Sequence, residues 1–359
     1  MTTTSTAPPS LPQGALPSDV VDSPGAAGGR RDTRLLGGSG KRPPHPTARQ
    51  MRWNAWLFLA VPLALFAVFM LLPVVIAGVI SFTDYAIVGE TAWVGLDNYA
   101  RIFQDAFFWI ALRNTAYYTL LYVPLGLVIA LGAAVLLNRG RRAVRLFRTL
   151  FYIPVVSSTV ATATIWYWLL NPQKGLLNMA LGWFGIDGPA WLYDSQWAMP
   201  AIVLMSVWAG FGANMIIFLG GLQGVPGDLY EAARLDGANA WQQFRYVTLP
   251  SLSRTTFLVS TLLIIGAFQV FDQAYVLTKG GPGNSTVTMV YYIYNKGFGA
   301  LEMGYASALS FVLFVIILTF SLANARLSRP RSDGGERRPR RSRPARRTNR
   351  RELGAVSAR

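Results

Sequence analysis

The chain has 359 residues, of which 52% are hydrophobic and only 14% are charged. Soluble globular domains carry about a quarter of charged residues, so this composition excludes an ordinary soluble protein. The formal net charge is +16, and the absence of cysteine together with a single histidine, His45, excludes disulfides, cysteine-ligated metals and most histidine-based metal sites and catalytic triads.

The N-terminal segment predicts no folded domain. Residues 1–50 are rich in Thr, Ser, Pro, Gly and Ala, a composition typical of a disordered tail. A Gly-rich stretch ending at Lys41 resembles a phosphate-binding loop. However, Leu35 stands where the first glycine is required, and Arg42 stands where Ser or Thr is required. We therefore expect no nucleotide site here and no cofactor in this chain.

Six apolar segments follow, and each is long enough to cross a bilayer, because about 20 helical residues at ~1.5 Å each span the ~30 Å hydrocarbon layer. Helices buried in a large soluble domain are the alternative, but they rarely run this far without a charge. The pattern predicts an all-α integral membrane protein with a six-helix transmembrane domain. The predicted spans are residues 57–81, 114–138, 149–170, 198–222, 255–278 and 303–325.

Basic residues indicate the orientation of these spans. Of the 33 Lys and Arg residues, 28 fall before the first span, in 139–148, in 223–254 or after residue 325. The remaining segments share five: Arg101, Arg113, Lys174, Lys279 and Lys296. Since Lys and Arg are enriched in cytoplasmic loops, we expect both termini and the 223–254 loop to be cytoplasmic.

The C-terminal segment 326–359 carries thirteen arginines with Pro and Gly between them. This pattern predicts a solvated, Arg-rich cytoplasmic tail that can touch anionic lipid. The positive net charge is therefore explained mostly by topology and tail, and we expect no nucleic-acid partner.

The polar loop between the fourth and fifth spans predicts two short helices. Asp228 can cap the first, with Glu231 three residues later as the second member of a capping box. Gly237 suits the left-handed residue that ends a helix. The second helix, over about 239–246, is expected to end before Pro250. The alternative is an amphipathic connector packed on the lipid face.

This loop resembles the EAA loop of binding-protein-dependent ABC importer permeases. In that signature a Glu-Ala-Ala triplet is followed after three residues by Gly, and the loop closes with hydrophobic-Leu-Pro. Here Thr248 precedes the final Leu-Pro, which is a slight departure. The matching residues are Glu231, Ala232, Ala233, Gly237, Leu249 and Pro250.

The resemblance covers residues 57–325 and leaves out only the tails. Segments 220–226, 277–286 and 291–294 also look like this family, and the last two look like its carbohydrate-uptake branch of maltose, multiple-sugar and glycerol-phosphate permeases. The maltose permease has extra N-terminal spans and a large periplasmic insert, and this chain has neither.

The resemblance implies an ABC type I importer permease fold and a permease subunit of an ATP-driven sugar importer in the bacterial cell membrane, not an enzyme. Implied partners are a second permease subunit in a heterodimer, two copies of a cytoplasmic ABC ATPase that bind ATP and Mg, an extracytoplasmic solute-binding protein, and the sugar. The loop 223–250 is the implied ATPase-coupling element. Its implied coupling residues are Glu231, Ala232, Ala233, Asp236, Gly237, Leu249 and Pro250.

Polar groups within the spans are candidates for the substrate path, because such groups are costly in lipid and generally face a cavity or another helix. Counted along a helix from Arg254, Asp272 is expected about 27 Å away, near the outer interface, with Gln269 about one turn deeper. For the aromatic candidates, Phe268 and Phe271, packing between helices is as good an explanation as stacking on a sugar ring. The candidates are Asn214, Phe268, Gln269, Phe271, Asp272 and Gln273.

Three other functions remain as alternatives. An ABC permease for a non-sugar solute would share the same loop. A secondary transporter would normally show acidic residues near midplane or an inverted repeat, and the spans show neither. A membrane-embedded enzyme would need paired carboxylates, His or a nucleophile triad, and a lone Asp272 with a tail histidine argues against it.

Overall fold

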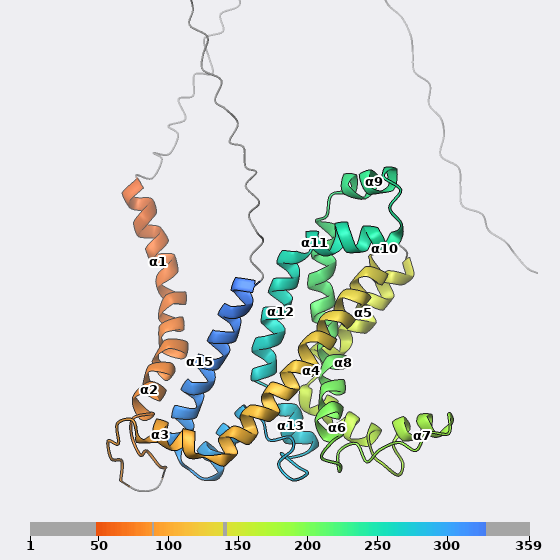
Figure 1. The fold of residues 1–359 in the computed structure, drawn as a ribbon. Coiled ribbons are helices and arrows are strands. Elements are labelled where there is room, and N and C mark those ends of the chain that lie inside the picture. Colours follow the sequence, from red (N-terminus) through yellow and green to blue (C-terminus); the bar gives the residue numbers. More distant parts are fainter. Residues whose placement is uncertain (1–47, 88–89, 139–141, 328–359) are drawn as a thin grey trace, which may run out of the picture. The chain divides into compact units, whose positions relative to one another are not determined.

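The structure is a computed structural model that describes residues 48–87, 90–138 and 142–327 (Figure 1). The chain divides into two compact units, and the division falls between Ala64 and Leu65 in the sequence. Within the described residues there is no strand, only isolated bridges between Thr83 and Trp93 and between Ala86 and Glu302. The predicted tails 1–50 and 326–359 lie almost entirely outside these residues.

Four helices are long and apolar enough to cross a membrane, or up to six spans if two bent helix pairs each count as one. This count covers the described part of the chain and agrees with an all-helical membrane protein. The four stretches are Trp56–Ile80, Ala106–Leu137, Ala198–Gln223 and Met303–Arg326. They correspond to α1 (Ala48–Phe66) with π-helical η1 (Ala67–Leu71) and α2 (Leu72–Ile80), to α4 (Ala106–Leu137), to α8 (Ala198–Gln223) and to α15 (Met303–Leu327).

The sequence predicts one continuous span at 149–170, but the structure has two helices there, separated by a break. Helix α5 (Arg142–Val156) and helix α6 (Thr159–Leu169) meet at a bend of 100°. Ser158 between them has an extended backbone, and Pro154 sits in the last turn of α5. A proline removes one helix hydrogen bond and clashes with the preceding turn, so a break is favoured close to it.

The segment predicted at 255–278 is also discontinuous. Helix α12 (Ser253–Phe268) ends before α13 (Asp272–Leu277) begins, and Phe271 is not helical, with φ −137° and ψ −63°. The carbonyl of buried Val270 accepts a hydrogen bond from the Thr288 hydroxyl at 2.8 Å. A distant residue therefore satisfies a backbone group that a continuous helix would bond internally.

Small residues form the contact face of α4. Gly126, Ala130 and Ala134 recur every four residues and are buried, whereas the larger Leu120 and Leu136 on the same helix are exposed. This arrangement inverts that of a soluble protein, since in lipid helices associate through close backbone approach rather than by hiding apolar side chains. The pattern supports a bilayer as the surroundings of α4.

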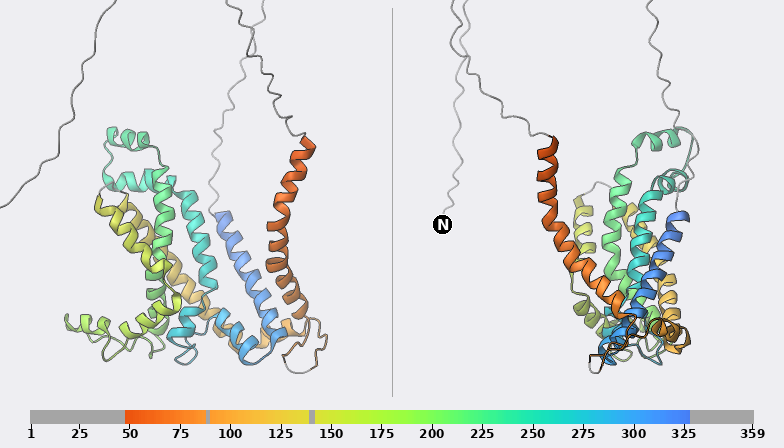
Figure 2. Two further views of the ribbon diagram at one scale, coloured as in Figure 1. Left: turned by 180° about the vertical axis from the view of Figure 1, so that it is seen from behind. Right: turned by 90° about the vertical axis from the view of Figure 1, so that its left-hand side faces the viewer.

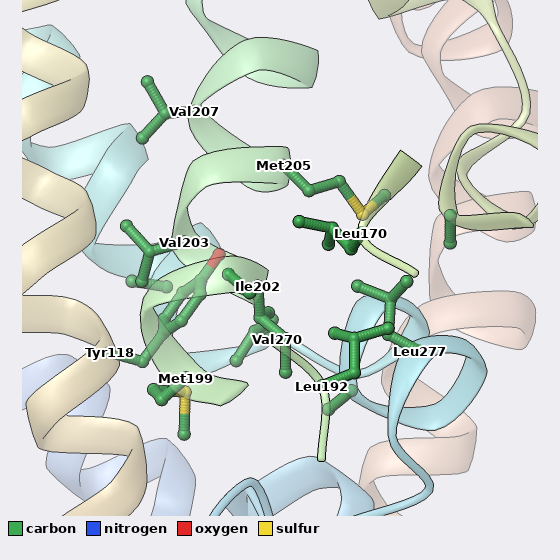
Figure 3. Close-up of a cluster of buried hydrophobic side chains, with 14 residues drawn as sticks. Tyr118, Leu170, Leu192, Met199, Ile202, Val203, Met205, Val207, Val270 and Leu277 are labelled. Atoms are coloured by element: carbon green, nitrogen blue, oxygen red, sulfur yellow. The ribbon is translucent and has the colours of Figure 1, made fainter. Parts of the chain in front are cut away.

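One buried cluster joins side chains of α4, α6, α8 and α13 and of the segments beside them (Figure 3). Tyr118 lies in α4, Ile202 lies in α8 and Val270 lies between α12 and α13, and each is almost fully buried. In Figure 3 they lie close to Met199 and Val203 along the α8 ribbon. The cluster thus holds the broken region after α12 against α8.

The remaining short helices gather at the two ends of the second unit. Near one end of α8 and α12 lie α9 (Gly227–Leu235) and α10 (Ala240–Gln243), continued by η2 (Phe244–Thr248) and α11 (Leu249–Ser251) (Figures 1 and 2). Near the other end lie α7 (Leu176–Gly182) and α13. The other short elements are α3 (Asp97–Gln104), α14 (Met289–Tyr294) and η3 (Asn295–Gly299).

Candidate functional site

The start of α9 differs from the predicted capping box. The N-cap residue is Pro226, and no side chain caps it, so Asp228 lies within the first turn instead of before it. Asp228 still opposes the positive end of the helix dipole there. The capping box forms at the next helix: Gln242 donates its backbone N–H to Asn239 Oδ1 at 2.9 Å, and Asn239 donates its own to Gln242 Oε1 at 2.8 Å.

Gly237 ends α9 as the sequence predicts. Its φ is +78°, in the left-handed region that only glycine enters without penalty. The backbone N–H of Ala238 donates to the Ala233 carbonyl at 2.9 Å, and that of Gly237 donates to the Arg234 carbonyl at 3.0 Å. These two bonds form a Schellman motif, which satisfies the last carbonyls of α9 and turns the chain sharply.

The second helix does not stop before Pro250, so that expectation is wrong. From Phe244 to Thr248 the backbone is π-helical, and the N–H of Leu249 donates five residues back, to the Phe244 carbonyl. The wider π turn accommodates the proline, because Pro250 then falls in the first turn of α11, where no donor is needed.

Two side-chain contacts tie these helices together. The Tyr230 and Thr248 hydroxyl oxygens lie 3.0 Å apart, and Gln243 Nε2 donates to the Ala238 carbonyl at 2.9 Å. Thr248 is buried, and the Tyr230 hydroxyl satisfies its hydroxyl at the position where the family signature has a hydrophobic residue. Sequence reasoning missed Tyr230 and Gln243, since both partners become visible only once the two helices pack.

Much of the surface of this helix pair is exposed. Glu231, Ala232, Asp236, Gly237 and Pro250 are exposed, whereas Ala233 and Leu249 are half-buried. Large apolar side chains are exposed beside them: Leu235 at 89%, Trp241 at 70% and Tyr246 at 72%. Exposed apolar side chains on a polar loop are typical of interaction surfaces.

The predicted substrate-path residues do not form one cluster. Asn214 is buried and donates to the Gly210 carbonyl at 3.2 Å within its own helix, and Phe268 is buried against Phe320 with ring centroids 5.1 Å apart. Gln269 and Asp272 are exposed. The helical distance from Arg254 to Asp272 does not apply, because α12 ends at Phe268.

Phe271 belongs to an aromatic group that the sequence did not reveal. Its ring centroid lies 5.3 Å from that of Tyr275 and 5.1 Å from that of Tyr294. Tyr275 is 40% exposed, and Gln273 beside it is half-buried. Exposed rings next to polar side chains can stack on a sugar, although the same rings pack well against each other.

A cavity of about 520 Å³ lies between α6, α13 and the loops beside them. Thr164, Tyr167, Tyr193 and Lys279 give its wall a polar part, and the Tyr167 and Tyr193 hydroxyl oxygens lie 2.9 Å apart. No group of three or more His, Cys, Asp or Glu side chains placed to hold a metal ion occurs in the described ranges. The hydroxyl and aromatic side chains of the cavity wall can form hydrogen bonds and stacking contacts.

Asp105 anchors distant parts of the chain at the same end. Its Oδ2 accepts hydrogen bonds from the hydroxyls of Tyr292 and, at 2.7 Å, Tyr305. Burial by itself raises the pKa of this carboxyl, but these bonds and those from the Phe107 and Phe108 N–H groups outweigh it, so its pKa lies below the ordinary value.

We expect Asp105→Asn to lower the unfolding midpoint by the same few degrees at pH 5 and at pH 8. A depressed folded-state pKa means that the carboxylate contributes at every pH above its unfolded value of about 3.9 and is lost only as pH falls through the folded value. The cost is about 1 kcal/mol, since the site is partly solvated. Thermal unfolding in detergent measures it, and an effect that vanished at pH 5 would contradict the depressed pKa.

Comparisons with known proteins identify the family of the chain. A sequence model of the family "binding-protein-dependent transport system inner membrane component" matches residues 122–331. The chain is 36% identical over 281 residues to the arabinooligosaccharides transport permease AraP of Bacillus subtilis, covering 76% of this chain and 88% of that protein. It is 35% identical over 310 residues to the diacetylchitobiose uptake permease NgcF of Streptomyces coelicolor, covering 82% and 87%.

A solved structure shares the fold. A chain of a bacterial ABC transporter involved in alginate import superposes with a TM-score of 0.69 at 24% identity, over 78% of this chain and 96% of that one. At this identity the likeness concerns the architecture of the helices alone.

Proposed function

The chain belongs to the family of binding-protein-dependent transport system inner membrane components, and we propose that it is a permease subunit of an ATP-driven sugar importer. It forms half of the transmembrane path and couples to a separate ATPase through the loop 223–250. The observation that carries this proposal is the helix pair α9–α10, in which the chain turns sharply at Gly237 and much of the surface is exposed.

The shape of this pair suits mechanical coupling. The Schellman turn at Gly237 and the capping box at Asn239 fix both helix ends, and the Tyr230–Thr248 contact joins them. A stiff element can pass a displacement of a docked motor to α8 and α12, which flank it in the chain, whereas a flexible loop would absorb it. No acid–base chemistry is needed in this chain.

The proposed topology has the six spans predicted from the sequence, 57–81, 114–138, 149–170, 198–222, 255–278 and 303–325, with both termini cytoplasmic. Basic residues support it, because 139–148 and 223–254 are rich in them. The opposite placement of α9–α10 and α13 supports it too (Figure 1). The membrane is then the bacterial cytoplasmic membrane.

The proposed assembly contains a second permease subunit, two copies of a cytoplasmic ATPase that binds ATP and Mg, and an extracytoplasmic solute-binding protein. The family description names dependence on a binding protein. One alginate transporter structure contains a periplasmic protein bound to an alginate pentasaccharide. These descriptions support the partners proposed here.

The proposed solute is a sugar, and an oligosaccharide fits best. Three of the relatives are named for arabinooligosaccharides, lactose and diacetylchitobiose. The cavity beside Tyr167 and Tyr193 presents hydroxyl groups and aromatic faces, and exposed Gln269 and Asp272 lie on the adjoining segment of the chain. These groups suit hydrogen bonding to sugar hydroxyls and stacking on pyranose rings.

Gly237→Ala is expected to insert normally and to lose solute-stimulated ATP hydrolysis. A Cβ at Gly237 would meet no atom within 4 Å, so the cost of ~1 kcal/mol or more comes from the left-handed backbone alone. The measurement is ATPase co-purification and stimulated hydrolysis in liposomes.

Gly237→Asn is the matched control, because Asn tolerates the left-handed conformation. It should retain most of the coupling. If Gly237→Ala coupled as well as the unaltered protein, the loop would be an ordinary connector, and the proposed function would lose its main support.

A further inference from the structure

Basic residues are scarce in the segments that the proposed topology places outside the cell. Only five occur there, and three of them, Arg101, Lys279 and Lys296, gather in one region of the structure. Retention of basic residues in the cytoplasm does not explain such a cluster on the opposite side. It calls for another reason.

Both lysines of this cluster line one cavity. The cavity has a volume of about 340 Å³, and Lys279 and Lys296 share its wall with Asn284, Asn295, Tyr291 and Phe107. Its lining contains no Asp or Glu. Ammonium and amide groups are hydrogen-bond donors, so the wall is suited to an anion.

The neighbouring carboxylates are already engaged. Asp105 Oδ2 accepts from Tyr292 and Tyr305, and Glu302 Oε2 lies 2.8 Å from Arg101 Nη2 but 3.7 Å from Lys296 Nζ. Lys279 forms no ion pair with any residue in the described ranges. Counting Arg101 and both lysines against Asp105 and Glu302, the region keeps a net charge of +1.

Surrounding contacts hold the backbone of Lys279 in place. Its φ is +49°, and its carbonyl accepts a hydrogen bond from the Tyr291 hydroxyl at 2.8 Å. Further along the loop, Asn114 Nδ2 donates to the Asn284 carbonyl at 2.8 Å and to the Val287 carbonyl at 3.1 Å. A backbone kept in an uncommon conformation by surrounding contacts is frequent at binding sites.

We propose that the cavity between Lys279 and Lys296 is a docking site for an acidic side chain of the extracytoplasmic solute-binding protein. This inference rests on the proposed function. Phe107 is the only lining residue inside a candidate span, and it is the second residue of that span. The site therefore lies in the outer connections, where a docking protein arrives, and it shares Lys279 with the cavity beside Tyr167 and Tyr193. Complementary charge steers such encounters and selects the partner.

The test uses the full transporter in nanodiscs and measures the dissociation constant of its purified solute-binding protein at low and high salt. Lys279→Gln and Lys296→Gln should each weaken binding about threefold to fivefold at low salt, and together about tenfold, with a smaller salt dependence. Lys174→Gln removes an exposed outward lysine that does not line the cavity, and it should change nothing. A solute-binding protein whose docking Asp or Glu is replaced by Lys should bind the double variant no less tightly than it binds the unaltered permease.

Two results would overturn the inference. One is unchanged affinity of the double variant at low salt. The other concerns digalacturonate, an acidic disaccharide, added without any binding protein. If it stabilised the transporter only when both lysines were present, the anion recognised by the cavity would belong to the solute. Neither result touches the proposed function, which fails instead if the unaltered transporter binds neither an ATPase nor a solute-binding protein.

Discussion

Gly212→Ala is expected to abolish recovery of folded protein. Gly212 lies in α8, where a Cβ would come within 2.0 Å of the Phe151 carbonyl oxygen and 2.9 Å of its carbonyl carbon, both in the backbone of α5. A side chain could rotate away, but a carbonyl moves only with its helix. Overpacking of this kind costs about 3 kcal/mol or more, a large part of the ~5–15 kcal/mol that stabilises a folded domain.

Gly220→Ala is the matched control for this substitution. Gly220 lies in the same helix, and a Cβ there would meet no atom within 4 Å. The variant should be as stable as the unaltered chain, or more stable by up to ~1 kcal/mol from helix propensity. Size-exclusion chromatography and thermal unfolding in detergent compare the two. Equal stability of the Gly212 and Gly220 variants would show that α5 does not pack this closely on α8.

The second large effect is expected from Trp241→Ala, which should weaken ATPase binding about thirtyfold or more. Trp241 is 70% exposed on the proposed docking face, and its ring lies 5.6 Å from that of Phe244. A preorganised aromatic anchor of this type typically contributes 2 kcal/mol or more to an interface, of which every 1.4 kcal/mol is tenfold in affinity. The capping box at Asn239 and Gln242 remains intact in this variant, so helix stability is not the cause.

Trp183→Ala supplies the control. Trp183 is 81% exposed next to α7, at the other end of the unit from α9 and α10 (Figure 1). This change should leave ATPase affinity unaltered, and titration of the purified ATPase into nanodiscs measures both variants. Equal affinities for the Trp241 and Trp183 variants would place the docking face elsewhere.

Several features could be predicted from sequence because they depend on local rules. Long apolar segments identify α4, α8 and α15, since span length follows from bilayer thickness. The left-handed Gly237 follows from its position after a helical triplet, because only glycine takes that conformation freely. The capping-box spacing, also a local rule, led to the wrong position, because Asn239 and Gln242 satisfy this spacing as well as Asp228 and Glu231 do.

The sequence by itself determined the class of protein, the long apolar stretches of α4, α8 and α15 and the sharp turn at Gly237. Only the tertiary structure decided the 100° bend between α5 and α6, the break after Phe268 and the burial of that ring. It also brought Lys279 and Lys296 around one cavity. The physical reason is that these features depend on partners far along the chain. Thr288 satisfies the Val270 carbonyl, and Tyr292 and Tyr305 reach Asp105, contacts that no window of neighbouring residues contains.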